Sequence, residues 1–203
     1  MQAVSLKTLL EDPRVEKLMW DCRAGSGALF HRHGVQLDGV VDLQLHCLAW
    51  SLASEEGLAQ TQSPAGPDPW APRRLRSLHW ALATANHAGM GPAERDAYSR
   101  VVRMARILSV PESGGTYDAW KRRPLPGVLR RYCTDATRFF ALRAFYQQTE
   151  AAHAEALREA EQLRLCDSCR TGVDGSGRSG GAGLRRADAE IELVAGLLGK
   201  DQR

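Results

Sequence analysis

Residues 119–134 concentrate positive charge and aromatic side chains in one short segment. The basic residues of the segment, with no acidic residue among them, are Lys121, Arg122, Arg123, Arg130 and Arg131. Trp120 and Tyr132 lie in the same segment. Basic side chains neutralise phosphates, and aromatic rings stack on unpaired bases. The segment therefore predicts binding of single-stranded nucleic acid, with a basic face that contacts only solvent as the alternative.

Asp42 is an acidic residue at the end of a predicted buried strand, Val40–Leu43. Functional sites of α/β proteins lie at the carboxyl ends of their strands. An aspartate here also caps the helix that follows, because its carboxylate accepts backbone N–H groups. We favour the capping role for Asp42, and a catalytic or metal-binding role is the alternative.

Two other patterns contain residues that bind metals in proteins. His31 and His33 are two positions apart on a predicted helix, so their side chains point to different faces. Cys166 and Cys169 form a single Cys-x-x-Cys pair at the end of a helix, without the further ligands that zinc requires. A redox pair lies instead at the start of a helix. We therefore expect no metal site from either pattern.

The elements that position these residues begin with a strand–helix–strand–helix unit. Hydrophobic segments predict strands at Val15–Trp20 and Val40–Leu43, and Gly34 is placed to end the intervening helix. The second helix carries apolar residues on one face at Leu45, Leu48, Ala49 and Leu52. This order predicts two parallel neighbouring strands.

Helices are expected to make up most of the remaining chain. Periodicity predicts helices over Leu75–Ala88 and Pro92–Leu108, the second with Met104 on its apolar face. A long helix is expected from Leu129 to Leu165. Its first half packs through Phe139, Leu142, Phe145 and Tyr146. Its second half, rich in alanine and glutamate, is expected to project from the fold.

Composition divides the chain into three parts. We expect a folded domain over residues 1–165 with a proline-rich loop at 54–72, a glycine-rich linker at 166–183, and an amphipathic helix at 184–203. The last segment offers a surface for a protein partner through residues 184–199.

Composition also limits the class of protein and the cellular compartment in which we expect it. Hydrophobic residues at 43% and charged residues at 25% are ordinary for a globular protein. The odd count of five cysteines favours a reducing compartment, so we expect an intracellular protein of the cytoplasm or nucleus. Acidic residues near the N-terminus and the lack of a long apolar run argue against a signal peptide or a membrane partner.

Four segments together resemble the ribonuclease-D-like (DEDD-type) 3′–5′ exonuclease domain family. Residues 17–29 are similar to its second motif, 40–44 to the strand that follows, 111–117 and 123–126 to the approach to the third motif, and 132–136 to that motif itself. The resemblance covers about residues 5–147. It implies an α/β fold of the ribonuclease-H-like type, truncated at the N-terminus and dominated by helices around a small remnant sheet.

The resemblance also implies a chemistry that this chain is not equipped to perform. The family hydrolyses phosphodiesters with two divalent cations, Mg²⁺ or Mn²⁺, held by acidic residues. Here the motif-two position is Gly25, and the motif-three position, four residues after Tyr132, is Ala136. No strand with an Asp-x-Glu pair precedes residue 15. Asp135 is one residue from the expected position, a shift that turns a helical side chain by about 100°. Asp42 and Asp135 remain as weak candidates, and we expect no cofactor in this chain.

The sequence therefore favours a 3′–5′ exonuclease-like domain that binds nucleic acid and is catalytically deficient. RNA is favoured over DNA, and the implied contact residues are Arg23, Lys121, Arg122, Arg123, Arg130, Arg131 and Tyr132. One alternative is a non-catalytic adaptor in an RNA-handling complex. Another is an active nuclease whose first motif lies upstream of Met1.

Overall fold

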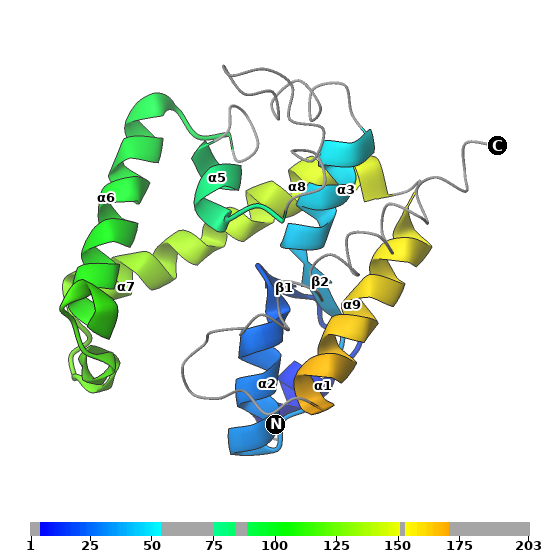
Figure 1. Ribbon diagram of the computed structural model, residues 1–203, viewed down its shortest axis with the longest axis horizontal. Helices are drawn as coiled ribbons and strands as arrows, with labels where there is room; N and C mark the ends of the chain where they lie inside the picture. Colours follow the sequence, from blue (N-terminus) through cyan, green and yellow to red (C-terminus); the bar gives the residue numbers. More distant parts are fainter. Residues whose placement is uncertain (1–4, 54–74, 84–88, 151–152, 171–203) are drawn as a thin grey trace. The chain divides into compact units, whose positions relative to one another are not determined.

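Helices dominate the described chain, and its sheet consists of two short parallel strands (Figure 1). The computed structural model describes residues 5–53, 75–83, 89–150 and 153–170. This architecture is compatible with the expected α/β class, with helices around a small sheet.

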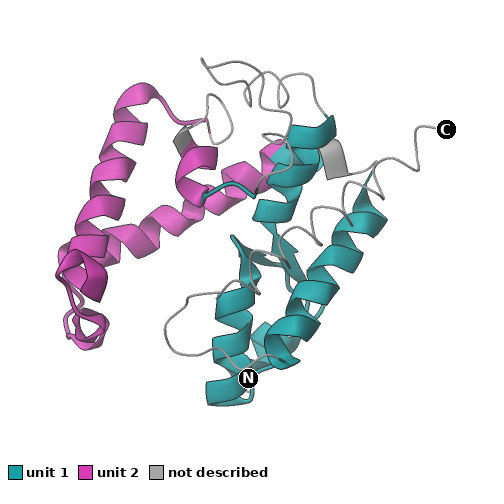
Figure 2. Ribbon diagram, viewed as in Figure 1, with its two compact units in different colours: residues 1–77, 146–203 teal, residues 78–145 magenta. Residues whose placement is uncertain are grey.

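The chain divides into two compact units, shown in teal and magenta in Figure 2. Unit 1 comprises residues 1–77 and 146–203, and unit 2 comprises residues 78–145. The sequence had predicted one domain over 1–165, whereas the structure separates residues 78–145 from the rest. Each unit is described by itself below.

Unit 1 contains the predicted strand–helix–strand–helix arrangement. After the short helix α1 (Leu6–Glu11), its elements are β1 (Lys17–Met19), α2 (Cys22–His33), β2 (Val40–Asp42) and α3 (Leu43–Ala53). The strands are parallel neighbours, as predicted, with Leu18 opposite Val41 and Met19 opposite Asp42. Both are shorter than predicted. β2 ends at Asp42 because the helix α3 begins at the next residue.

Two glycines shape the connection between α2 and β2. Gly34 adopts φ 58° and ends α2, which confirms the predicted C-cap. Gly39 adopts φ 60°, and its carbonyl accepts the Lys17 N–H at 2.9 Å. A Cβ atom at Gly39 would lie 2.8 Å from the Pro13 carbonyl oxygen. Only glycine fits this approach, which brings the start of β2 beside β1.

Helix α9 (Ala154–Arg170) packs on α2, α3 and β2, so the expectation that this segment projects was wrong. Alanine and leucine recur along it at helical spacing and form a buried stripe. The stripe packs against the apolar face of α3 that the sequence predicted. Together they form one hydrophobic cluster of Leu45, Leu48, Ala49, Leu157 and Ala160. The helix also includes residues 166–170, which had been assigned to the linker.

Unit 2 is formed by helices alone among its described residues. Its elements are α5 (Leu78–Ala83), α6 (Pro92–Ser109), η2 (Pro111–Ser113), η3 (Tyr117–Lys121), α7 (Gly127–Thr134), η4 (Asp135–Thr137) and the first part of α8 (Arg138–Glu150). Ala105, Ala119 and Leu129 form its buried cluster, bringing α6, η3 and α7 together.

Two sequence predictions in this region need correction. The helix expected to run unbroken from Leu129 is interrupted by the 3₁₀ turn η4. There the Thr134 and Thr137 hydroxyls donate to backbone carbonyls, a bond that competes with regular helix. Met104 is 51% exposed, because the buried face of α6 passes through Tyr98 and through Ala105, the next residue after Met104 and one that the helical spacing also predicted as apolar. In α8, by contrast, Leu142 and Tyr146 of the predicted face are buried.

Candidate nucleic-acid interface and buried carboxylate cluster

The Asp42 carboxylate, at the carboxyl end of β2, is fully buried and caps two helices. Its Oδ1 accepts the Gln44 N–H of α3 at 3.1 Å and the Asp21 N–H at 3.0 Å. Its Oδ2 accepts the Cys22 N–H, the first of α2, at 2.9 Å. The capping role predicted for Asp42 is confirmed, and it extends to the start of α2.

The fourth partner of Asp42 is a buried arginine on α9. Arg164 Nη1 lies 2.7 Å from Asp42 Oδ2, and both side chains are 0% exposed. The same nitrogen donates to Gln44 Oε1 at 3.2 Å. A carboxylate has about four acceptor positions, and these four donors use them all. Asp42 is therefore committed to the fold.

Glu161, one helical turn before Arg164, brings a second buried carboxylate to the same place. Its Oε1 accepts the Asp42 N–H at 2.8 Å and lies 3.2 Å from His46 Nε2. Asp42, Gln44, His46, Glu161 and Arg164, here called the Asp42 cluster, thus join β2, α3 and α9. The cluster was missed in the sequence, although the alanine–leucine stripe of α9 indicated a buried face.

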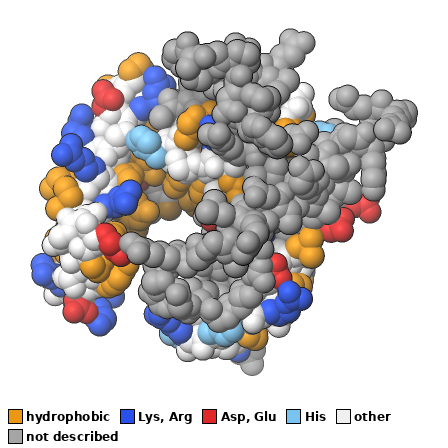
Figure 3. Space-filling view, in the orientation of Figure 1, with side chains coloured by type: hydrophobic (Ala, Val, Ile, Leu, Met, Phe, Trp, Pro, Cys, Tyr) orange, Lys and Arg blue, Asp and Glu red, His pale blue; other side chains and the backbone are white. Residues whose placement is uncertain are grey.

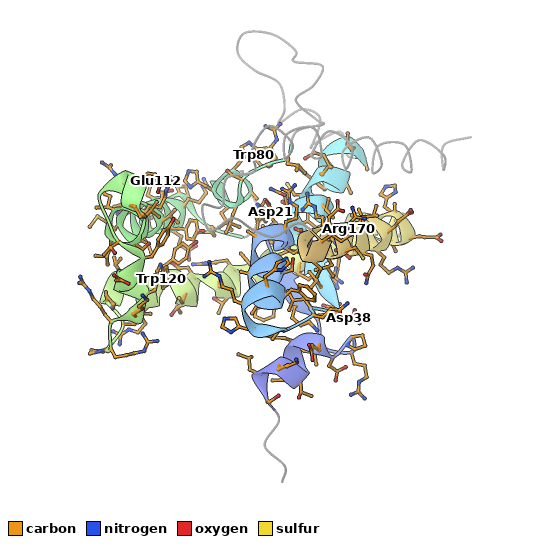
Figure 4. The ribbon with its side chains drawn as sticks, turned by 60° about the horizontal axis from the view of Figure 1, so that its bottom comes forward. Asp21, Asp38, Trp80, Glu112, Trp120 and Arg170 are labelled. Atoms are coloured by element: carbon orange, nitrogen blue, oxygen red, sulfur yellow. The ribbon has the colours of Figure 1, made fainter. Side chains whose placement is uncertain are left out.

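Asp21 borders the Asp42 cluster at the start of α2, where Figure 4 labels it. Its carboxylate accepts two hydrogen bonds from the Arg23 guanidinium, at 2.6 and 2.8 Å. Burial opposes ionisation of Asp21, but the hydrogen bonds from Arg23 and then the charges of Arg23 and Arg164 outweigh it and lower the pKa of the carboxyl. Arg23, predicted to bind nucleic acid, therefore lies in unit 1 and is engaged with Asp21.

The two positions that correspond to metal ligands in the family that the sequence resembles carry no carboxylate. Gly25 lies in α2, and a Cβ atom there would meet Met19 Cε at 2.9 Å. The Met19 methyl group therefore occupies the space into which a side chain at position 25 would point. Ala136 lies in η4 of unit 2 and offers no ligand. Within the described ranges, no three His, Cys, Asp or Glu side chains are grouped to hold a metal ion.

Asp135, the other weak candidate, is a buried residue of unit 2. It is 8% exposed, and its Oδ1 lies 3.2 Å from Arg131 Nε. Asp135 follows the last residue of α7 and begins η4. The structure therefore gives Asp135 an arginine partner one turn earlier in the chain.

Apart from Arg23, the predicted basic residues and both aromatic residues lie on two segments of unit 2 that contact each other. Lys121, Arg122 and Arg123 lie at the end of η3 and just after it, whereas Arg130, Arg131 and Tyr132 lie on α7. The Trp120 and Tyr132 rings join the two segments, with centroids 6.2 Å apart in an edge-to-face contact. We call these residues together the basic surface. Figure 3 shows Lys and Arg side chains interspersed with hydrophobic ones on the visible face of unit 2, at the left.

The cations of the basic surface differ in the hydrogen bonds and ion pairs that they form within the protein. Lys121 Nζ lies 2.7 Å from Asp118 Oδ1, and this hydrogen bond lowers the pKa of Asp118 and raises that of Lys121. Arg123 donates to the backbone carbonyls of Trp120 and Arg122. Arg122 and Arg130 are exposed and form no ion pair with any residue the structure describes.

The acids that pair with the basic surface were missed because they lie just outside segment 119–134. Asp118 precedes that segment and Asp135 follows it. On a helix, residues three and four positions apart are neighbours, so Asp118 pairs with Lys121 after it and Asp135 pairs with Arg131 before it. Helical spacing across the ends of the segment was the signal that could have found them.

The remaining predicted patterns lie in unit 1 or outside the described residues. His31 Nε2 lies 3.2 Å from the Ser168 carbonyl oxygen, and His33 is exposed. Cys166 and Cys169 occupy the last turn of α9, as expected, and are both free thiols. The partner segment 184–199, the rest of the linker and the loop 54–72 lie outside the described residues.

In the described part of the chain, no helix has the length and apolar character needed to cross a bilayer. No protein-family model, curated protein or solved structure matches the chain.

Proposed function

We propose that the chain is a ribonuclease-D-like, ribonuclease-H-fold domain that binds single-stranded nucleic acid through the basic surface and does not hydrolyse it. The ligand is RNA in preference to DNA. The observation that carries the proposal is the pair of exposed arginines without carboxylate partners in the described chain, Arg122 and Arg130, on the two segments that meet at the Trp120–Tyr132 contact. Cations of this kind bind phosphates with release of counterions, and an exposed ring stacks on a base.

The absence of hydrolysis follows from the residues at the family's catalytic positions. Gly25 and Ala136 have no carboxylates, and the acceptor positions of Asp42 are filled by four donors within the protein. Two divalent cations require several free carboxylate oxygens to hold them. The residues present do not fit such a pair of cations.

Binding is tested by fluorescence anisotropy with labelled oligonucleotides of equal length, as single-stranded RNA, single-stranded DNA and duplex. We expect single-stranded RNA to bind most tightly, and its affinity to fall steeply between 50 and 200 mM salt. Replacing Lys121, Arg122 and Arg123 with alanine should abolish binding. The control replaces Arg14, Arg32 and Arg158, three exposed arginines of unit 1, and should retain it. A protein that binds no oligonucleotide, or binds independently of salt, would contradict the proposal and leave the adaptor hypothesis.

Hydrolysis is tested with a 5′-labelled RNA incubated with Mg²⁺ or Mn²⁺. We expect no shortening above a mock preparation, for the unmodified protein and for the double variant Gly25→Asp, Ala136→Asp. Metal-dependent trimming from the 3′ end that is abolished by Asp135→Asn would show a working nuclease and overturn this part of the proposal.

A further inference from the structure

The 3₁₀ helix η3 presents two aromatic residues on the same side. Tyr117 and Trp120 are three positions apart, and side chains at this spacing eclipse one another in a 3₁₀ helix. The ion pair of Asp118 and Lys121, also three apart, shows the same alignment on a neighbouring side of η3. Trp120 also contacts Tyr132 of α7. We call Tyr117, Trp120 and Tyr132 the aromatic row, since Tyr117 shares a side of η3 with Trp120 by its spacing.

The middle ring of this aromatic row is anchored and the outer two are exposed. Trp120, a residue of η3, packs against the buried cluster of Ala105, Ala119 and Leu129, and this packing anchors its ring. Tyr117 is 54% exposed and Tyr132 is 38% exposed. The Tyr132 ring is already held against Trp120, so it loses little conformational freedom on stacking with a ligand. The row therefore offers two accessible tyrosine rings. Figure 4 labels Trp120.

The cations on η3, α7 and the residues just after η3 differ in whether a carboxylate already binds them. Arg122 follows η3 and Arg130 lies on α7, and neither has a carboxylate partner among the described residues. Arg131 is held by the buried Asp135, whose carboxylate would lose its arginine if Arg131 turned to a phosphate. Lys121 is held by Asp118.

We infer that Tyr117 and Tyr132 are stacking sites for two unpaired bases, with Arg122 and Arg130 contacting the phosphates. This inference rests on the proposed function and specifies its ligand as a strand whose bases are free to stack. Lys121 and Arg131 are secondary, because their positive charges are already partly balanced by Asp118 and Asp135. A duplex, whose bases stack on one another, cannot use the two tyrosines.

The test compares a single-stranded RNA with an abasic oligonucleotide of the same length and charge, by fluorescence anisotropy. Stacking on one aromatic side chain changes affinity by about 5- to 150-fold. We therefore expect the RNA to bind at least tenfold more tightly than the abasic strand. Tyr117→Leu and Tyr132→Leu should each weaken RNA binding about tenfold and leave abasic binding unchanged, whereas Tyr117→Phe should bind as the unmodified protein does.

Further variants separate the aromatic and ionic contributions. Arg122→Ala and Arg130→Ala should weaken binding of both strands, and more strongly than Lys121→Ala or Arg131→Ala. Phe140→Leu removes a 69% exposed ring elsewhere in unit 2 and should change neither affinity. Equal binding of the RNA and the abasic strand, or an equal effect of all four cation variants, would overturn the inference while leaving nucleic-acid binding in place. If neither strand binds, the proposed function itself fails.

Discussion

The two units use oppositely charged side chains in different ways. In unit 1, Asp42 and Arg164 form an ion pair with both side chains 0% exposed. In unit 2, the side chains of Lys121 and Asp118 are 80% and 71% exposed, although their atoms lie equally close at 2.7 Å. The two ion pairs have the same N–O distance, but only the first is shielded from solvent. Buried charges lose their hydration and must be fully paired, whereas exposed charges exchange partners readily.

This difference separates the residues that maintain the fold from those available to a ligand. Asp42 has its carboxylate oxygens filled by donors from α2, α3 and α9 and cannot take a new partner without loss of stability. Arg122 and Arg130 have no such commitment to a carboxylate in the described chain. An acid at the end of a strand therefore does not by itself indicate a functional site.

The largest effect is expected from Arg164→Met, which leaves Asp42 buried without its cation. Breaking one side of a buried ion pair costs about 3–5 kcal/mol. We expect the free energy of unfolding to fall by that amount in urea titrations followed by far-UV circular dichroism. Arg158→Met, at an exposed position of the same helix, is the matched control and should change it by less than about 0.5 kcal/mol.

A second variant distinguishes lost charge pairing from lost packing. Asp42→Asn added to Arg164→Met removes the unpaired charge and should restore part of the stability. If Arg164→Met alone unfolds no more easily than Arg158→Met, the Asp42 cluster does not hold unit 1 together and the comparison of the units fails.

The sequence predicted the elements whose signals are local. The strand pair, the cap at Gly34 and the apolar face of α3 depend on neighbouring residues or on helical periodicity, and all three are confirmed. Helix α9 was misjudged because its alanines and glutamates are typical of an exposed helix. Its alanine–leucine stripe was a local sign of burial, but its ion pair with Asp42 joins residues 122 positions apart, which no local pattern reveals.

The sequence predicted which basic and aromatic residues form the basic surface, but it did not predict the acidic residues that pair with them. The charge run and the aromatic residues were evident, but a count within 119–134 excluded Asp118 and Asp135. Tyr117 was not recognised as part of the surface, because its alignment with Trp120 requires the 3₁₀ geometry of η3.

The next largest effect tests whether the units keep separate cores. Leu129→Ala opens a cavity in the buried cluster of unit 2 and should destabilise it by about 3 kcal/mol. Hydrogen exchange followed by mass spectrometry should show faster exchange in peptides from α6 and α7, and unchanged exchange in β1 and α2. Leu45→Ala should give the reverse. Equal acceleration in both units by either variant would show that they unfold together.

A smaller effect concerns pH and Asp21. Because the folded-state pKa of Asp21 lies below its ordinary value, its ionised carboxylate stabilises the fold above about pH 4. That contribution is lost as the pH falls through the lowered pKa. Asn is chosen as the replacement because Asp21 has φ 58°, which asparagine tolerates. Asp21→Asn should cost about 1 kcal/mol at pH 7, and the difference from the unmodified protein should narrow as the pH falls through the lowered pKa of Asp21. A difference in the free energy of unfolding that stays constant over this pH range would contradict the lowered pKa of Asp21.

The smallest effect is expected at an exposed ion pair of unit 2. Arg138 Nη2 lies 3.3 Å from Glu94 Oε1, with side chains 28% and 52% exposed, so Arg138→Ala should cost less than about 1 kcal/mol. Glu94→Ala should cost more than Arg138→Ala, because Glu94 also accepts the Gly91 N–H at 3.0 Å and caps the start of α6. Urea titrations in low and high salt would measure both variants, and only the Arg138 effect should vanish in salt, since screening weakens an exposed pair. A cost at Arg138 as large as that at Arg164 would show that exposure does not separate the two kinds of ion pair.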